Sequence, residues 1–406
     1  MFWRDWPVFY VESLVRYFDA NATTPLHPAA RAAWLQASAD HWQNPSSLSG
    51  AATEARECLD DARETLGELL GCEPQRILFT GSATAANNGL ARHLAKALNP
   101  VPGELLISAV EHPSFAVPMA AALPGRVREL PVDEAGRVMP AGVEEELAAA
   151  AKPAFLSLLA ANNETGVLHD WEEMAGLCRH AGVWFHTDAS QWIGKLPPGR
   201  LGRADFVTGS SHKFGGPKGV GFLVVPGEAA AFTGDQGGPQ QQGRWAGTEN
   251  LPSIVSMVAA LEAVAHETEG FAGAMWQERQ AARDDFERVV MQEIPGAIIL
   301  GRQAERLWNT SAVLLPGHDG RRLVAAVERQ GIAASTGAAC SSGSDATAKA
   351  VTAIGFSRLG LPAGSQWAML RLSAGWSTTA ADWQAAAQAV SAVVQGAGPL
   401  PRISLG

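Results

Sequence analysis

Short apolar runs that alternate with helical segments predict an α/β protein built on a mostly parallel sheet. The predicted strands are Arg76–Thr80, Leu105–Ser108, Ala154–Leu159, Val183–Phe185, Asp205–Thr208 and Gly221–Val225. The chain has 406 residues, of which 47% are hydrophobic, so it can form a large core and two domains. We therefore expect an α/β domain joined to a second, smaller domain.

The predicted helices lie before, between and after these strands. They cover residues 28–70 (including a long run from about Ala51 to Leu70), Trp171–Ala181 and Pro252–Val290. Beyond them, Ser311–Leu315 and Met369–Ser373 have the pattern of strands and predict a smaller α+β domain. The expected division is an N-terminal extension at 1–17, a large domain at 18–265 and a small domain at 266–406, on which the N-terminal segment packs.

Composition excludes several classes of protein. A net charge of −10 and a pI near 5.5 argue against nucleic acid as the main partner. The four cysteines are far apart and include no C-x-x-C pair, so neither a metal site nor a disulfide framework is expected. The N-terminus has no basic region followed by an apolar core, which argues against a signal peptide or membrane span. We expect a cytoplasmic protein with reduced cysteines.

Lys213 stands between an apolar run and a glycine-rich turn, within the segment Val207–Phe222. A lysine that ends a buried strand loses hydration, which lowers the pKa of its amine, and the neutral amine is a nucleophile that can bond to a carbonyl cofactor. Ser210 and His212 beside it are short polar groups suited to binding a phosphate. For an isolated Ser-His-Lys sequence, a solvated loop lysine is the alternative.

Asp188 ends the preceding predicted strand, in the segment Val183–Gln191. Ligands of open α/β sheets bind at the carboxyl ends of the strands, so Asp188 and Lys213 are expected to face one crevice. A carboxylate there can keep the pyridine nitrogen of pyridoxal 5′-phosphate (PLP) protonated, which makes the ring an electron sink. Taken alone, an aspartate after a strand is more often a helix cap.

These two segments and eight others resemble, in the same order, the cysteine desulfurases of the NifS/IscS type, within the class V aminotransferase family of PLP enzymes. The matching segments are Tyr17–Pro25, Asn44–Ser47, Phe79–Thr84, Glu111–Pro113, Asn162–Gly166, His186–Gln191, Ser211–Lys213, Gly247–Asn250, Ser335–Cys340 and Leu370–Ser373. The resemblance covers nearly the whole chain after about residue 17. It implies fold type I of the PLP-dependent transferases, with a mostly parallel seven-stranded sheet flanked by helices, and a homodimer.

The resemblance implies roles for residues around the cofactor ring. Lys213 would bond to PLP and later move the substrate's α-proton. Asp188 would hold the ring nitrogen, and Gln191 would hydrogen-bond the phenolic oxygen. His112 would stack on the ring and pass protons, tasks that suit an imidazole that titrates near neutrality.

A second group is expected at the cofactor phosphate. Ala83 and Thr84 match the first turn of the helix that contacts the phosphate, where amide groups and small hydroxyls favour anions. Ser210 and His212 lie beside the lysine. Thr248 matches the residue that reaches the cofactor phosphate of the neighbouring subunit.

Substrate binding and sulfur transfer are implied for three more residues. Asn163 and Arg371 match the pair that holds the α-carboxylate of L-cysteine, where a guanidinium can bind bidentately. Cys340 lies in a segment of small residues, so we expect it on a mobile loop, although a buried cysteine is the usual alternative. The resemblance implies that Cys340 takes the sulfur as a persulfide, leaves L-alanine, and passes the sulfur to an acceptor protein for iron–sulfur cluster assembly or for thiolation of tRNA or cofactors.

The chain departs from the family pattern at three positions. Gln242, Trp245 and Trp376 stand where relatives commonly have arginines, and Arg244 is offset by one position. These changes leave alternatives open. The protein could be another class V enzyme, such as a selenocysteine lyase or an aminotransferase, or a non-catalytic scaffold that keeps the PLP fold.

Overall fold

The computed structural model describes residues 15–99, 101–227, 232–269, 274–337, 348–361 and 367–397. Its strands are β1 (Arg16–Tyr17), β2 (Ile77–Thr80), β3 (Leu105–Ser108), β4 (Val127–Leu130), β5 (Phe155–Leu159), β6 (Trp184–Asp188), β7 (Phe206–Ser210), β8 (Gly221–Val224), β9 (Ile298–Ile299), β10 (Thr310–Pro316), β11 (Ile332–Ala333) and β12 (Trp367–Ser373). Its helices are α1 (Pro28–Asp40), α2 (Thr53–Leu70), α3 (Ala83–Ala97), α4 (Pro113–Ala122), α5 (Pro140–Ala148), α6 (Trp171–Ala181), α7 (Leu251–Glu269), α8 (Ala274–Glu293), α9 (Gly320–Glu328), α10 (Lys349–Ile354) and α11 (Ala380–Ala397).

The main sheet has seven strands in the order β2-β8-β7-β6-β5-β3-β4. Neighbours from β7 to β4 run parallel, whereas β8 is antiparallel to both β7 and β2. The expected mostly parallel sheet is therefore confirmed. Because β6 and β7 are parallel neighbours, their carboxyl ends lie at the same edge, and Asp188 and Ser210 end these strands.

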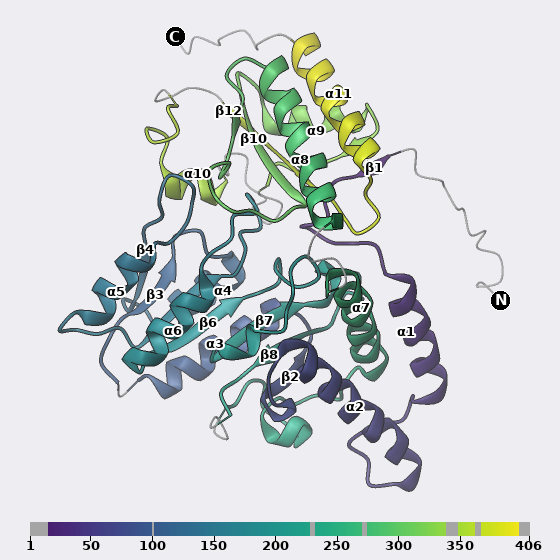
Figure 1. Cartoon of the computed structure of the whole chain (residues 1–406). Coiled ribbons are helices and arrows are strands. Elements are labelled where there is room, and N and C mark those ends of the chain that lie inside the picture. Colours follow the sequence, from purple (N-terminus) through teal and green to yellow (C-terminus); the bar gives the residue numbers. More distant parts are fainter. Residues whose placement is uncertain are drawn as a thin grey trace, which may run out of the picture.

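Helices cover both faces of this sheet. Alternate side chains of a strand point to opposite faces, and the buried residues of β2 follow that rule. Ile77 and Phe79 contribute to a core with residues of α2, α6 and α7, whereas Leu78 belongs to a second core with residues of α3 and α4. Figure 1 shows α3 and α4 near the sheet in the lower half of the molecule, with α1, α2 and α7 gathered to the right.

A smaller α+β unit lies above the main sheet in Figure 1. It contains the antiparallel sheet β12-β10-β9, and α8, α9 and α11 pack nearby. The N-terminal strand β1 pairs with β11 of this unit, and the ring of Phe18 packs against that of Trp383 at 4.8 Å between centroids. The start of the described chain is thereby tied to its last helix.

One sequence prediction needs correction. The helix expected at 28–70 is interrupted, since α1 ends at Asp40 and α2 begins at Thr53. The helix expected from Pro252 to Val290 corresponds to α7 and α8, and residues 270–273 between them lie outside the described residues. Strand β4 was not predicted at all, because its sequence Val-Arg-Glu-Leu has two charged residues in four.

The outer strands of the main sheet have different neighbours. At β2, the side chain of Gln241 binds the backbone of Phe79 twice: Oε1 accepts from Phe79 N (2.7 Å) and Nε2 donates to Phe79 O (2.8 Å). At β4, Arg128 forms ion pairs of 2.6 Å with both Glu104 and Glu146. Both outer strands, β2 and β4, therefore have polar side-chain contacts at the edges of the sheet.

Candidate active site

The residues predicted around the cofactor and substrate line one cavity of about 410 Å³. It lies at the carboxyl ends of β6 and β7, next to the first turns of α3 and α4. The predicted residues that line it are Ala83, Thr84, His112, Asn163, Asp188, Gln191, Ser210, His212, Lys213 and Arg371. Thr248 is exposed and is not among the lining residues, and Cys340 lies outside the described residues.

Lys213 ends a short 3-10 turn that follows β7 directly. Its Nζ donates to two backbone carbonyls, Asn21 O at 2.6 Å and Ala22 O at 2.8 Å. His212, next to it, has its Nδ1 at 3.1 Å from Thr23 Oγ1. Burial, with Lys213 close by, lowers the pKa of His212 to about 4, so its imidazole is neutral at pH 7.

Asp188 is 5% exposed at the end of β6. Its Oδ1 accepts from Ser190 N at 2.9 Å, and its Oδ2 accepts from Asn87 Nδ2 at 3.4 Å. These contacts fix the carboxylate at the cavity wall, where it can receive a further donor. The alternative of a helix cap does not apply, because no helix begins next to Asp188.

His112 caps the start of α4. Its Nδ1 accepts from Ser114 N (3.1 Å) and lies 2.8 Å from Ser114 Oγ. Burial lowers the pKa of His112, although Asp188 opposes this effect. The ring is therefore held in one orientation and is mainly neutral at pH 7.

Gln191 is held at both ends of its amide. Nε2 donates to Asn21 O at 2.9 Å, and Oε1 accepts from Lys195 Nζ at 3.1 Å. Lys195 is 4% exposed, and burial together with the charges of Lys213 and Arg371 lowers the pKa of its amine to about 7. Sequence reasoning missed Lys195, because its position four residues after Gln191 does not reveal that the side chain is buried.

The first turn of α3 also lines the cavity, through Ala83 and Thr84. The Ser82 side chain caps the helix by accepting from Ala85 N at 3.0 Å. The amides of the first helical turn, at the cavity residues Ala83 and Thr84, can bind an anion there. Gly221 lies against this turn, and a Cβ there would come within 3.0 Å of Ala83 N and 2.9 Å of Ser82 C. The glycine thus permits the close approach of β8 and α3.

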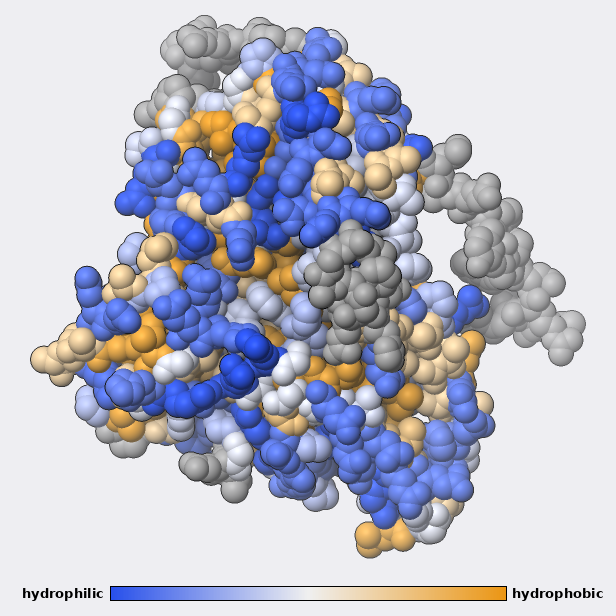
Figure 2. Space-filling model, viewed as in Figure 1, coloured by the Kyte–Doolittle hydropathy of each residue, from blue (hydrophilic) through white to orange (hydrophobic). Residues whose placement is uncertain are grey.

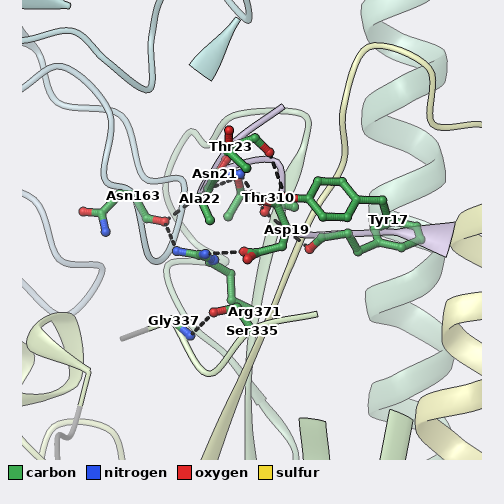
Figure 3. A network of polar contacts seen from close by, with 12 residues as sticks. Tyr17, Asp19, Asn21, Ala22, Thr23, Asn163, Thr310, Ser335, Gly337 and Arg371 are labelled. Atoms are coloured by element: carbon green, nitrogen blue, oxygen red, sulfur yellow. Dashed lines mark hydrogen bonds and ion pairs between the residues drawn. The ribbon is translucent and has the colours of Figure 1, made fainter. Parts of the chain in front are cut away.

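Arg371 enters the cavity from β12, and Figure 3 shows its contacts. Its Nη2 donates to Asp19 Oδ1 at 2.6 Å and its Nη1 to Asn163 O at 3.0 Å. Nε is buried and has no hydrogen-bond partner among the described residues. The predicted pair Asn163 and Arg371 is therefore in contact, and Asp19 is a third member that sequence reasoning did not assign.

A row of buried polar side chains continues from the cavity into the sheet. Ser157 Oγ lies 2.8 Å from His186 Nδ1, and Thr208 Oγ1 lies 3.2 Å from His186 Nε2. Burial lowers the pKa of His186 to about 3, so this ring is neutral. At the cavity end, burial and the charge of Asp188 raise the pKa of Glu111 well above its usual value, which favours the protonated acid.

The positions that depart from the family pattern lie away from the cavity. Trp245 is 6% exposed and packs so closely on Gly89 and Gly234 that a Cβ on either glycine would clash with its ring. Arg244 donates to Gln75 O at 2.8 Å. The ring of Trp376 packs edge-to-face against the ring of His27. Two of the three positions are therefore occupied by tryptophan rings that pack against neighbouring residues.

The cavity fits PLP. Its volume lies within the range of small-molecule sites. It brings together an amine for a carbonyl group, a buried carboxylate for a ring nitrogen and the amides of a helix N-terminus for a phosphate. Ser190 Oγ, on a lining residue, is buried without a hydrogen-bond partner in the described part of the chain, so an acceptor or donor from a ligand would satisfy it. No group of side chains with metal-binding geometry occurs among the residues that the structure describes.

The comparisons with known proteins agree with this geometry. The family model of class V aminotransferases matches residues 16–385. A cysteine desulfurase of Cereibacter sphaeroides is 38% identical over 80% of this chain and 83% of its own, and a cysteine desulfurase IscS of Dictyoglomus turgidum is 31% identical over 81% and 82%. A solved NifS-like protein superposes with a TM-score of 0.82 at 25% identity, covering 94% of this chain and all of the other.

The relatives span most of the chain, and the cavity contains an amine, a carboxylate and helix N-terminal amides that fit PLP. The resemblance inferred from ten short segments is thus confirmed over the whole fold. The chain belongs to the class V aminotransferase family of PLP-dependent enzymes and, within it, to the cysteine desulfurases of the NifS/IscS type.

Proposed function

We propose that this protein converts L-cysteine to L-alanine and transfers the sulfur to Cys340 as a persulfide. The observation that carries the proposal is the meeting of Lys213, Asp188 and Arg371 at one cavity, in a chain 38% identical to a cysteine desulfurase. The persulfide would supply an acceptor protein of iron–sulfur cluster assembly or of tRNA or cofactor thiolation.

The chain's own residues would divide the work as follows. Arg371 and Asn163 bind the α-carboxylate of the substrate, and Asp188 holds a proton on the ring nitrogen of PLP. PLP, when bound, draws electrons from the bond between the substrate's α-carbon and its hydrogen. The amine of Lys213 accepts that proton, and Gln191 orients the ring through its phenolic oxygen. His112, mainly neutral because burial lowers its pKa, accepts and returns a proton on the face of the ring.

Sulfur transfer then needs a thiolate, and Cys340 is the best candidate of the four cysteines. Burial raises the pKa of Cys178 to about 12 and that of Cys72 to about 11, and it also raises the pKa of Cys58. The Cys340 thiolate forms a bond to the substrate sulfur while the bond between that sulfur and its carbon breaks. The electron pair goes to the carbon product, which takes up protons and leaves as L-alanine, so no external oxidant is required.

The decisive experiment is to incubate the PLP-loaded protein with L-cysteine and to measure alanine and protein-bound sulfur. We expect peptide mass spectrometry to find one added sulfur on Cys340, and Cys340→Ser to bind PLP and L-cysteine but to give neither persulfide nor catalytic alanine. The matched control is Cys58→Ser, which should keep full activity. Undiminished alanine formation by Cys340→Ser would favour a selenocysteine lyase or another class V reaction, and a protein that binds no PLP would favour the scaffold.

We also propose a cytoplasmic homodimer in which Thr248 reaches the partner's cofactor phosphate, with the domain boundaries expected at 17/18 and 265/266. Supporting the dimer, several large apolar residues on and after α1 are exposed: Trp34, Leu35, Trp42 and Leu48. Figure 2 shows hydrophobic residues among hydrophilic ones on the right, where Figure 1 places α1. Light scattering coupled to size-exclusion chromatography tests the proposal, since a mass near 42.7 kDa would indicate a monomer.

No described helix is long and apolar enough to span a membrane.

A further inference from the structure

Arg371 already binds a carboxylate of its own chain. Its side chain is 3% exposed, and Asp19 Oδ1 accepts from Nη2 at 2.6 Å. Figure 3 shows Asp19 on one side of the guanidinium and Asn163 on the other. A buried guanidinium without a counter-ion is costly, so Asp19 compensates the charge of Arg371 before any ligand binds.

The backbone of Asp19 is fixed in a turn, and its carboxylate, 23% exposed, hydrogen-bonds Arg371. The Asp19 carbonyl accepts from Ala22 N (2.9 Å) and from the Tyr17 hydroxyl (3.1 Å), which fixes the turn. Within the described part of the chain, Arg371 is the hydrogen-bond partner recorded for the Asp19 side chain. A change confined to that carboxylate therefore acts on Arg371 and leaves the turn in place.

The other nearby acid, Glu164, has a separate task. Its two oxygens accept from Lys349 N at 3.2 Å and from Ala350 N at 2.8 Å, which caps α10. Asp19 is thus the acid in direct contact with the guanidinium, whose Nε has no acceptor in the described structure. A ligand carboxylate that binds the remaining N–H groups would come close to Asp19, and two carboxylates at one guanidinium repel each other.

We propose that Asp19 is a specificity-determining residue that sets the affinity of the site for amino acid carboxylates by sharing Arg371 with them. The inference rests on the proposed role of Arg371 in substrate binding. Asp19 orients the guanidinium and prevents it from retaining stray anions, and its negative charge weakens the hold on the product's carboxylate. L-Alanine then dissociates more easily, and the site binds amino acid carboxylates less tightly.

The test is equilibrium binding to the PLP-loaded protein, measured by isothermal titration calorimetry with L-alanine and with L-alaninamide, which lacks the carboxylate. Asp19→Asn keeps an oxygen acceptor for Arg371 but removes the charge. We expect it to lower the Kd of L-alanine about three- to tenfold, from removal of one repulsive contact in a partly buried site, with no gain for L-alaninamide. Asp19→Glu, which keeps the charge, should give no such gain.

The matched control is Asp382→Asn, which removes the charge from an ion pair of the same small unit, Arg16–Asp382 at 2.9 Å, and should leave both Kd values unchanged. Unchanged or weaker L-alanine binding by Asp19→Asn, equal gains for both ligands, or failure of this variant to fold would overturn the inference. Arg371→Met separates the two proposals. It should weaken L-alanine binding whatever Asp19 does, and if it does not, the proposed substrate site itself is wrong.

Discussion

The cofactor side and the substrate side of the cavity are built in different ways. Asp188 and Lys213 lie at or just after the ends of neighbouring parallel strands. Arg371, Asn163 and Asp19 come from three segments far apart in the sequence. The backbone at Asp19 pairs with Ser373 of β12, and Arg371 contacts both Asp19 and Asn163. In a parallel sheet, residues that end neighbouring strands lie side by side because of the strand pairing itself. On the substrate side, the buried charge of Arg371 also needs the opposite charge of Asp19, and a substitution of Asp19 can change the affinity for a ligand.

The largest effect is expected on the cofactor side, from Lys213→Ala. Loss of the amine removes both the covalent link to PLP and the base for the α-proton, so turnover should fall at least about a thousandfold. The protein should still fold, because the hydrogen bonds from Lys213 to the carbonyls of Asn21 and Ala22 hold a single turn at the cavity and not the core of the sheet. Borohydride reduction followed by peptide mass spectrometry should label Lys213 in the wild type. A label on another lysine would contradict the assignment.

A smaller effect is expected for Asp188→Asn. An amide cannot hold a proton on the pyridine nitrogen, so the rate should fall about a hundredfold while much of the PLP remains bound. The Asn side chain can still accept from Ser190 N, which preserves the local backbone. Steady-state kinetics with L-cysteine, normalised to PLP content, measures this effect. Turnover within a few-fold of the wild type would refute the role.

Lys195 lies between the two sides and should have the smallest effect, on stability. Its pKa is lowered to about 7 by burial, so between pH 7 and about 10 the unfolded state binds a proton that the folded state does not. Stability should therefore rise with pH in this window, and below pH 7 the full cost of burying the charge should be present.

The comparison with Lys195→Met isolates this contribution. In urea unfolding of the protein without PLP, the free energy of unfolding of the wild type relative to Lys195→Met should rise by about 2 kcal/mol from pH 7 to pH 9. A pH-independent difference between the two proteins would show that Lys195 is not titrating in that range, and would leave the hydrogen bond to Gln191 as its only role.

The same contrast explains what the sequence could predict. Asp188 and Lys213 were predicted because polar residues directly follow apolar runs, and the sheet makes those strand ends neighbours. Asp19 and Lys195 were missed, since nothing local to either residue reveals which buried cation or amide it contacts. The break between α1 and α2 and the charged strand β4 were also missed, because long-range packing decides both.

The contact between Gln241 and the outer strand β2 bears on solubility. An outer strand presents N–H and C=O groups that can pair with a strand of another molecule and seed aggregation. The Gln241 amide hydrogen-bonds the N–H and C=O of Phe79 as a neighbouring strand would. At the other edge, Arg128 of β4 and its ion-pair partners Glu104 and Glu146 place charged groups beside the strand. Both outer strands of the seven-stranded sheet thus carry protection against intermolecular β-pairing, independent of catalysis.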